Sequence, residues 1–157
     1  MEYTLFYGGV FSQWYGWNNP PQFNIDGINY NCAEQYMMAE KARLFEDKVA
    51  EAKIMNLKHP KDQKAWGRKV KNFVGYKWQK VAKDIVYKGN HAKFTQNEEL
   101  LKELKRTGDT LLVEASPYDR IWGIGLGTDD SRRFDKKNWQ GTNWLGEILT
   151  KLRDDLE

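Results

Sequence analysis

A long stretch of strong helix-forming residues is the feature that most constrains the fold. From Cys32 to Leu57 the chain is rich in Ala, Glu, Lys, Met and Leu, and no Gly or Pro occurs before Pro60. Because these residue types have the highest helix propensities, the stretch predicts one helix from about Cys32 to Leu57. Asn31, just before it, is the expected N-cap.

Weaker patterns predict further helices. Asp62 is the candidate cap of a helix through Trp66 to Lys71, which Gly75 is expected to end. The segment WQKVAKDIVYKGNHAKF has apolar residues at near-helical spacing, with Gly89 as a candidate interruption. Two more helices are predicted at Glu98–Arg106, stopped by Gly108, and at Trp144–Leu156.

Short β elements complete the pattern. TLFYGGVFSQW predicts a strand and a turn at its glycines, and FNIDGINY a hairpin turning at Asp26-Gly27. The intervening QWYGWNNPPQ is expected to be a loop, because paired prolines remove hydrogen-bond donors. LLVEAS predicts a strand near residues 111–115. The expected fold is mainly α (α+β), a single compact domain over residues 1–157 with a small N-terminal β portion.

Composition limits the environment in which the protein works. Hydrophobic residues make up 40%, and no run approaches the roughly 18 apolar residues of a membrane-spanning helix, so we expect no membrane association. The stretch MEYTLFYGGVF lacks the basic and apolar regions of a secretory signal. The single cysteine, Cys32, cannot form an intrachain disulfide, which favours a reducing compartment and predicts a cytoplasmic protein.

Positive charge is concentrated in the middle of the chain. The net charge is +3, yet Lys58 to Lys93 holds 11 Lys or Arg against two Asp, a local charge of +9. A solvated helical surface is one interpretation. The other is a positive field that attracts the phosphates of a nucleotide or nucleic acid.

Aromatic residues are more abundant than a small core requires, at 14% with 7 Trp. Each tryptophan can be an ordinary core residue with its N–H satisfied. Some of the rings are instead expected to line a cavity, where they could stack on a heterocycle.

Two constellations could carry chemistry. Glu34 and Lys41 are two helical turns apart on nearly the same face, about 10 Å along the axis, where they could flank a ligand. The alternative is that they lie at the solvent edges of a core face containing Met38 and Phe45. In LVEASPYDRIWGIG, Glu114 lies in an apolar strand and therefore requires a partner or a function.

The same motif leaves two more residues open to two interpretations. Asp119 could stabilise a turn or act on substrate, and Trp122 could pack in the core or form a pocket wall. Its glycines do not form a dinucleotide-binding fingerprint.

Other catalytic signatures are not found. His59 and His91 are too far apart to suggest a local metal site, and one cysteine cannot build a thiolate zinc site, so we predict no metal and no cofactor. Neither Ser116 nor Cys32 has the context of a nucleophile.

Four stretches, in order along almost the whole chain, resemble the NADAR family of YbiA-like N-glycosidases. They are FYGGVFSQWY, NCAEQYMMAEKA, KAWGRKV, and VEASPYDRIWGIGLG with the later TNWLGEIL. Gln35 stands where the family usually has His, and residues 14–17 form an unusually tryptophan-rich loop. The resemblance implies an enzyme that cleaves the bond between a ribose and a nitrogen.

Two substrate classes follow from the resemblance, namely ribosylaminopyrimidine phosphates from riboflavin synthesis and ADP-ribose attached to guanine. It implies catalytic roles for Glu34, Lys41 and Asp119. Substrate binding is expected from a second set of residues: Glu114, Trp122, Trp78, Trp66, Arg68 and Gly123. The basic middle segment would attract phosphates and make transient contact with nucleic acid. The rival interpretations are a non-catalytic ADP-ribose or nucleotide-binding module and a single-stranded nucleic-acid binder.

Overall fold

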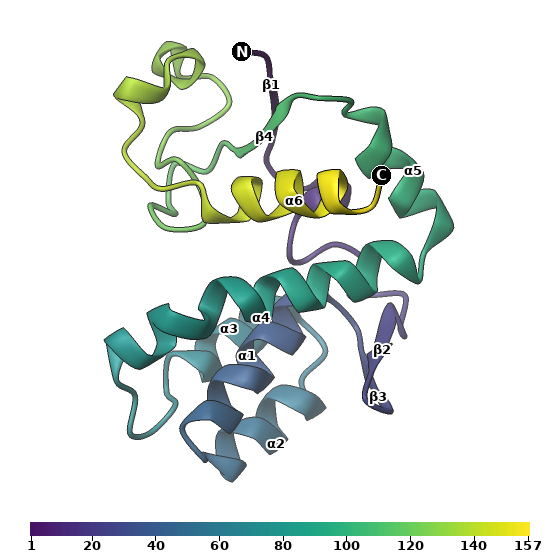
Figure 1. The fold of residues 1–157 in the computed structure, drawn as a ribbon. Helices are drawn as coiled ribbons and strands as arrows, with labels where there is room; N and C mark the ends of the chain where they lie inside the picture. Colours follow the sequence, from purple (N-terminus) through teal and green to yellow (C-terminus); the bar gives the residue numbers. More distant parts are fainter. The chain divides into compact units, whose positions relative to one another are not determined.

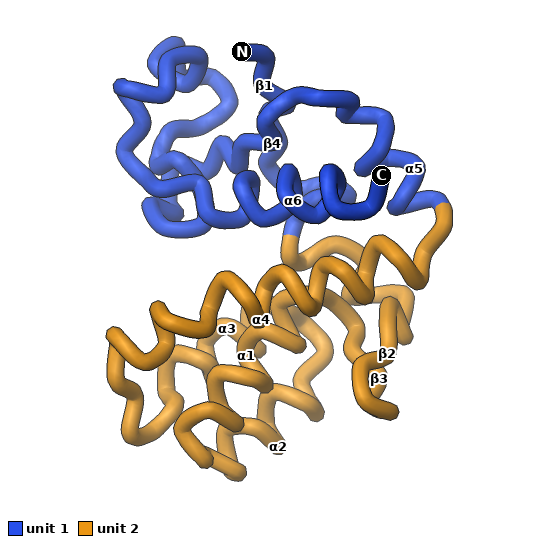
Figure 2. The backbone as a smooth tube through the Cα atoms, in the orientation of Figure 1, with its two compact units in different colours: residues 1–12, 99–157 blue, residues 13–98 orange.

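The computed structural model describes residues 1–157, which form two compact units. Unit 1 consists of Met1–Ser12 with Glu99–Glu157, and unit 2 of Gln13–Glu98 (Figure 2). The two ends of the chain therefore belong to the same unit.

Unit 2 is built on four helices, α1 (Ala33–Leu44), α2 (Lys48–Asn56), α3 (Pro60–Gly67) and α4 (Gly75–Thr95). Helix α1 packs against the other three (Figure 1). This central place explains why eight of its residues are buried, including Glu34 and Gln35.

The predicted helix from Cys32 to Leu57 is wrong in one respect, because α1 and α2 are separate helices. The chain leaves α1 at Phe45 and takes a left-handed conformation at Glu46, with φ of 56°. Asp47 then caps α2, its side chain accepting a hydrogen bond of 3.0 Å from the backbone N–H of Ala50. Propensity alone predicts a continuous helix, and this local cap overrides it.

Helix starts also differ from the predicted ones. Cys32 rather than Asn31 is the N-cap residue of α1, and the Asn31 amide donates to the backbone oxygen of Lys58 instead. His59 rather than Asp62 caps α3, its Nδ1 accepting from the N–H of Lys61. Pro60 occupies the first turn of α3, where a missing N–H costs little.

Helix α4 runs without interruption through Gly89 and begins at Gly75. Gly89 is required by packing, because a Cβ there would lie 2.8 Å from Cδ2 of Tyr36 on α1. Gly89 therefore marks a close contact between α1 and α4, and the predicted interruption of the helix is wrong.

A small hairpin completes unit 2. Strands β2 (Phe23–Ile25) and β3 (Ile28–Tyr30) pair antiparallel, with Phe23 opposite Tyr30. Asp26 and Gly27 both have positive φ, as the predicted turn requires.

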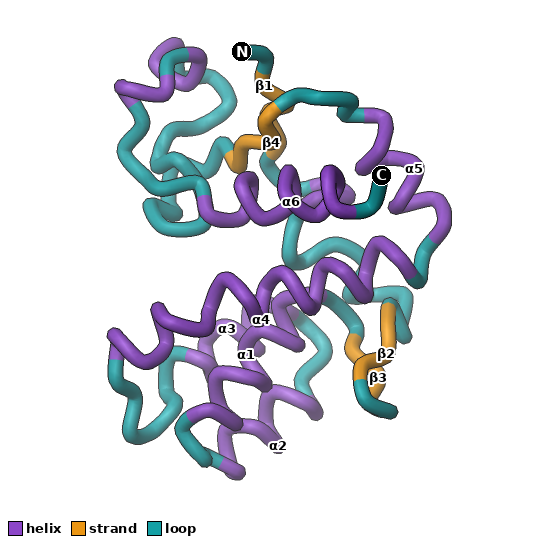
Figure 3. Tube along the Cα trace, in the orientation of Figure 1, coloured by secondary structure: helices purple, strands orange, loops and turns teal.

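Unit 1 holds a two-stranded parallel sheet, in which β1 (Tyr3–Phe6) pairs with β4 (Leu111–Glu114) (Figure 3). Helices α5 (Glu98–Arg106) and α6 (Trp144–Asp155) confirm two predicted segments, and short 3-10 turns lie between β4 and α6. A core of Val113, Ile124 and Leu126 is packed against Tyr3, Leu5, Leu111 and Trp139.

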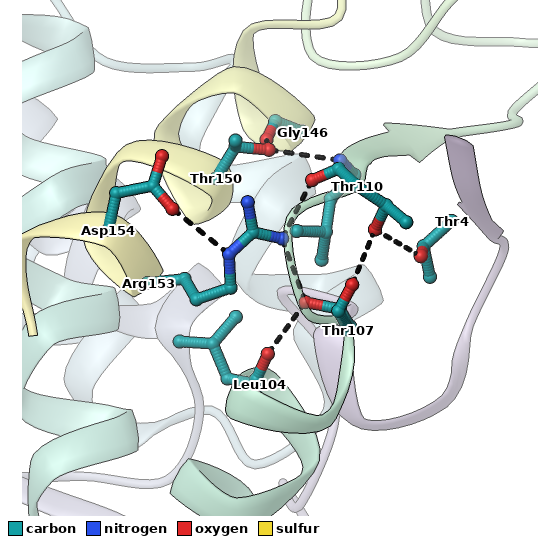
Figure 4. A network of polar contacts seen from close by, with 9 residues as sticks. Thr4, Leu104, Thr107, Thr110, Gly146, Thr150, Arg153 and Asp154 are labelled. Carbon is teal, nitrogen blue, oxygen red and sulfur yellow. Dashed lines mark hydrogen bonds and ion pairs between the residues drawn. The ribbon is translucent and has the colours of Figure 1, made fainter. Parts of the chain in front are cut away.

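A buried guanidinium fastens the C-terminal helix within unit 1. Arg153 is 2% exposed, and its Nη1 donates to Oγ1 of Thr107 and to the backbone oxygen of Thr110 (Figure 4). Thr110 Oγ1 lies 2.6 Å from Oγ1 of Thr4 on β1. This network ties α6 to the segment between α5 and β4.

The observed elements confirm the predicted fold class, mainly α (α+β) with a small N-terminal β portion and a strand at 111–114. None of the helices has both the length and the apolar character needed to span a membrane.

Candidate functional site

Glu34 is a buried carboxylate in the first turn of α1. It is only 4% exposed, so the interpretation that placed it at a solvent edge is wrong. Its backbone N–H donates to the oxygen of Gln13 at 3.0 Å, which satisfies one of the free donors at the helix N-terminus. A carboxylate here is also favoured by the helix dipole.

Lys41 lies two turns further along the same helix, among aromatic rings. Its Nζ is 4.6 Å from the centre of the Phe73 ring and 5.8 Å from that of Trp78. Burial lowers the pKa of Lys41, the charge of Glu34 opposes that change, and the charge of Arg68 reinforces it. A larger fraction of this amine is therefore neutral, and so nucleophilic, than of an exposed lysine.

Four predicted site residues of unit 2 are thus brought together. Glu34 and Arg68 both act on the charge of Lys41, and Trp78 flanks its amine. Phe73 belongs to this group and was missed, because a lone phenylalanine in the sequence KNFVG carries no signal of its own. The ring of Trp66 contacts other lysines than Lys41. It lies 4.9 Å from Nζ of Lys69 and 5.9 Å from Nζ of Lys53.

Gln35 has a structural role. Its Oε1 accepts from the backbone N–H of Asn31 at 2.8 Å, and its Nε2 donates to the oxygen of Ile54 at 3.2 Å. The side chain thereby joins the start of α1 to the end of α2.

In unit 1, Glu114 lies at the end of β4 beside Gly123. Its backbone N–H donates to Oδ1 of Asn143, and its backbone oxygen accepts from Ile124 at 3.0 Å. A Cβ on Gly123 would lie 3.1 Å from Oε2 of Glu114 and 3.0 Å from the backbone oxygen of Asp119. Any side chain at position 123 would therefore crowd this carboxylate.

Asp119 stabilises the turn that follows β4. Its Oδ1 accepts hydrogen bonds from the backbone N–H groups of Ile121 and Trp122, at 2.9 and 2.8 Å. The interpretation of Asp119 as a turn-stabilising residue is thus confirmed. Its catalytic role stays a prediction. The ring of Trp122 meets that of Trp144 edge to face at 5.5 Å.

The predicted site residues fall into one group in each unit. Glu34, Lys41, Arg68 and Trp78 belong to unit 2, and Glu114, Asp119, Trp122 and Gly123 to unit 1. The remaining predicted residue, Trp66, also belongs to unit 2.

The basic segment is mostly solvated, as the first interpretation held. Of its eleven Lys and Arg, nine are exposed and Lys64 is half-buried. Lys93 is the exception, because it is fully buried, with Nζ 5.0 Å from the Phe94 ring and 5.7 Å from the Tyr15 ring. Burial lowers its pKa to about 7, with the thiol of Cys32 acting in the opposite direction.

The chain is similar to proteins of one family along nearly its whole length. A family model described as the NADAR domain matches residues 5–157. N-glycosidase R617 of Acanthamoeba polyphaga mimivirus is 41% identical, over 98% of this chain and 96% of that protein. The NMR structure of the E. coli protein YbiA is 28% identical with a TM-score of 0.78, covering 99% of this chain and 84% of that one.

A plant protein is also similar. The chloroplastic riboflavin biosynthesis protein PYRR of Zea mays is 28% identical over 87% of this chain, a match that covers 21% of that longer protein.

Proposed function

Because this chain belongs to the NADAR family, we propose that it hydrolyses the bond between a ribose and a nitrogen in a phosphorylated ribosyl substrate. The predicted class of enzyme, an N-glycosidase, is confirmed by relatives that carry this name. The observation that supports the proposal most is the half-buried amine of Lys41, which shares its surroundings with Glu34, Arg68 and two aromatic rings.

Lys41 supplies the nucleophile in this proposal. The lone pair of its neutral Nζ attacks the anomeric carbon, the bond to the base nitrogen breaks, and the base leaves with that electron pair and a proton. The sugar stays on the lysine as a glycosylamine. Its C1–O4′ bond then breaks as the Nζ lone pair forms the C=N bond, and the ring oxygen takes up a proton, which leaves the opened sugar as a protonated Schiff base. Water then hydrolyses it, which releases the sugar and regenerates the amine.

Glu34 supplies proton transfer and charge stabilisation. Positive charge develops at the anomeric carbon as the base departs, so a buried carboxylate aimed there stabilises the transition state more than the ground state. The same group can pass a proton to the leaving nitrogen. Trp78 stacks on the base or sugar, and Arg68 and Trp66 contact phosphate or base.

For the residues of unit 1, the proposal rests on the resemblance to the family. Asp119 orients water or ribose hydroxyls with the oxygen that is not engaged in the turn. Glu114 contacts the sugar, Trp122 stacks on the base, and Gly123 admits the substrate close to the backbone.

Two substrates are candidates, ADP-ribosylated guanine and a ribosylaminopyrimidine phosphate. The name of the similar Zea mays protein, a riboflavin biosynthesis protein, supports the second. The test is to incubate the protein with ADP-ribosyl-guanosine and, separately, with a ribosylaminopyrimidine phosphate, and to measure free base and reducing sugar. The proposal is supported if the wild type releases both products, if Glu34→Gln abolishes this release, and if the exposed control Glu46→Gln retains it. Tight retention of either compound without turnover supports a binding module instead.

A second candidate function, contact with single-stranded nucleic acid, is favoured by one cluster in unit 2. The rings of Trp14 and Trp17 both pack on His59, at 5.9 and 4.5 Å, and the exposed Lys58 and Lys61 flank that histidine in sequence. Aromatic rings beside lysines are suited to stack on bases and attract phosphates. We propose that such contact is transient and delivers a nucleic-acid-linked substrate in a reducing compartment.

A further inference from the structure

Two buried side-chain amides near the start of α1 each have a hydrogen-bonding group that no protein atom satisfies. Asn90 on α4 is fully buried, and its Oδ1 has no hydrogen-bond partner. Nε2 of Gln13 is likewise buried without a partner. Such groups are rare in folded proteins, because a buried donor or acceptor without a partner loses the hydrogen bonds that it makes with water in the unfolded chain.

The orientation of both amides is fixed by their remaining bonds. Nδ2 of Asn90 donates to the backbone oxygen of Val86 and to Oε1 of Gln13, both at 2.9 Å. Turning the Asn90 amide over would set two oxygens against each other at Val86, and turning that of Gln13 would set two NH₂ groups face to face. The donor of Gln13 and the acceptor of Asn90 are therefore the groups left over.

This amide pair is joined directly to the helix turn that carries Glu34. The backbone oxygen of Gln13 accepts from the backbone N–H of Glu34 at 3.0 Å. A ligand atom that meets the leftover donor and acceptor is thus held close to the start of α1.

We propose that Gln13 and Asn90 bind one hydroxyl of the ribosyl substrate. A hydroxyl can accept from Nε2 of Gln13 and donate to Oδ1 of Asn90 at the same time, so it satisfies both leftover groups. This inference rests on the proposed function for the identity of the sugar. It adds two substrate-binding residues, which would orient the ribose relative to Glu34.

The test combines a variant with altered substrates. Gln13→Met keeps the side-chain volume but removes both the donor and the Oε1 that accepts from Asn90. Gln79→Met makes the same change at an exposed position of α4. We expect Gln13→Met to lower kcat/KM about tenfold or more on the intact ribosyl substrate, while Gln79→Met has no effect. Wild-type protein should lose a similar factor on either the 2′-deoxy or the 3′-deoxy analogue. On that analogue, Gln13→Met should show no further loss.

Three outcomes overturn the amide pair as a hydroxyl site. In the first, Gln13→Met is as active as the wild type, which means that the pair holds only a bound water. In the second, its loss is equal on intact and deoxy substrates. In the third, its activity falls together with its thermal unfolding midpoint, which indicates a structural role.

Binding of ADP-ribose, measured by calorimetry, tests the pair without turnover. We expect Gln13→Met to weaken this binding about tenfold. An inactive wild-type protein that binds ADP-ribose through Gln13 would refute the proposed function and leave the hydroxyl site standing. An active enzyme whose affinity for ADP-ribose is unchanged in Gln13→Met would refute the hydroxyl site alone.

Discussion

Lys41 differs from the surface lysines around it because its surroundings oppose a positive charge. Burial is the largest influence on its pKa, and the guanidinium of Arg68 lowers the pKa further while Glu34 raises it. The Phe73 ring offers a weak attraction to the ammonium but no hydrogen bond. The balance leaves an amine that loses its proton more readily than an exposed lysine does.

Removing Arg68 should therefore change the pH dependence of the reaction. Without that charge the pKa of Lys41 rises, so less amine is neutral at a given pH and the acid limb of the kcat profile moves to higher pH. We expect Arg68→Ala to show this move and Lys77→Ala, an exposed charge on α4, to leave the limb in place. An acid limb that stays put in Arg68→Ala would show that Lys41 does not titrate in the rate-determining step.

The buried Lys93 should make stability depend on pH. Its pKa is about 7 in the folded protein and near 10.5 in the unfolded chain. Below pH 7 both states are protonated and the full penalty of burying the charge is present. Between pH 7 and 10.5 the unfolded chain binds more protons, so the free energy of unfolding rises with pH.

Lys93→Met should flatten that rise, because the substitution removes the titrating group and keeps most of the side-chain volume. Denaturant unfolding at several pH values between 7 and 10.5 measures it, with the exposed Lys80→Met as control. Equal slopes for wild type and Lys93→Met would mean that another group sets the pH dependence.

At the scale of elements, the contact between α1 and α4 depends on a glycine. Gly89→Ala places a methyl group 2.8 Å from the buried ring of Tyr36, so the helices must separate or the ring must shift. We expect a loss of about 1–3 kcal/mol in the free energy of unfolding. Gly75→Ala on the same helix meets only Cε2 of Phe73 at 3.9 Å and should be tolerated.

Thermal and denaturant unfolding of the two alanine variants provide the comparison. If Gly89→Ala were as stable as Gly75→Ala, the close packing of Tyr36 on α4 would not exist in solution.

Sequence patterns predicted elements well where periodicity and terminal signals agreed, as for Glu98–Arg106 and Trp144–Asp155. They failed at Phe45–Asp47. The helix break there consists of a left-handed Glu46 and an N-cap at Asp47, and the stretch has no Gly or Pro that would indicate it. The pairing of β1 with β4 joins segments about a hundred residues apart, which local propensity cannot indicate. Gly89 was misinterpreted because only the position of Tyr36 explains it.

The candidate site was predictable to a similar degree. Helical spacing placed Glu34 and Lys41 on nearly the same face, and the apolar context of Glu114 predicted either a structural partner or a function for its carboxylate. Phe73 and the amide pair of Gln13 with Asn90 come from loops and helices far apart in sequence, so only tertiary structure reveals them. Lys93 belongs to a segment whose other Lys and Arg residues are exposed or half-buried, so charge counting alone does not distinguish it from them.

At the scale of the whole molecule, the local charge of +9 predicts how the protein meets nucleic acid. We expect weak, salt-dependent binding to single-stranded oligonucleotides, weaker at higher salt because counterions compete for the phosphates. Trp14→Ala with Trp17→Ala should weaken it further, measured by fluorescence anisotropy. Binding that is tight, and unaffected by Glu34→Ala or Trp122→Ala, would instead favour the interpretation as a nucleic-acid binder.

The most direct test of the whole account is to trap the sugar on the enzyme. Borohydride added during turnover reduces a Schiff base to a stable amine, and peptide mass spectrometry then locates the adduct. If Lys41 is the nucleophile, a sugar adduct forms on Lys41 and is missing from Lys41→Ala, which should also be inactive. No adduct on Lys41, together with full activity of Lys41→Ala, would contradict it.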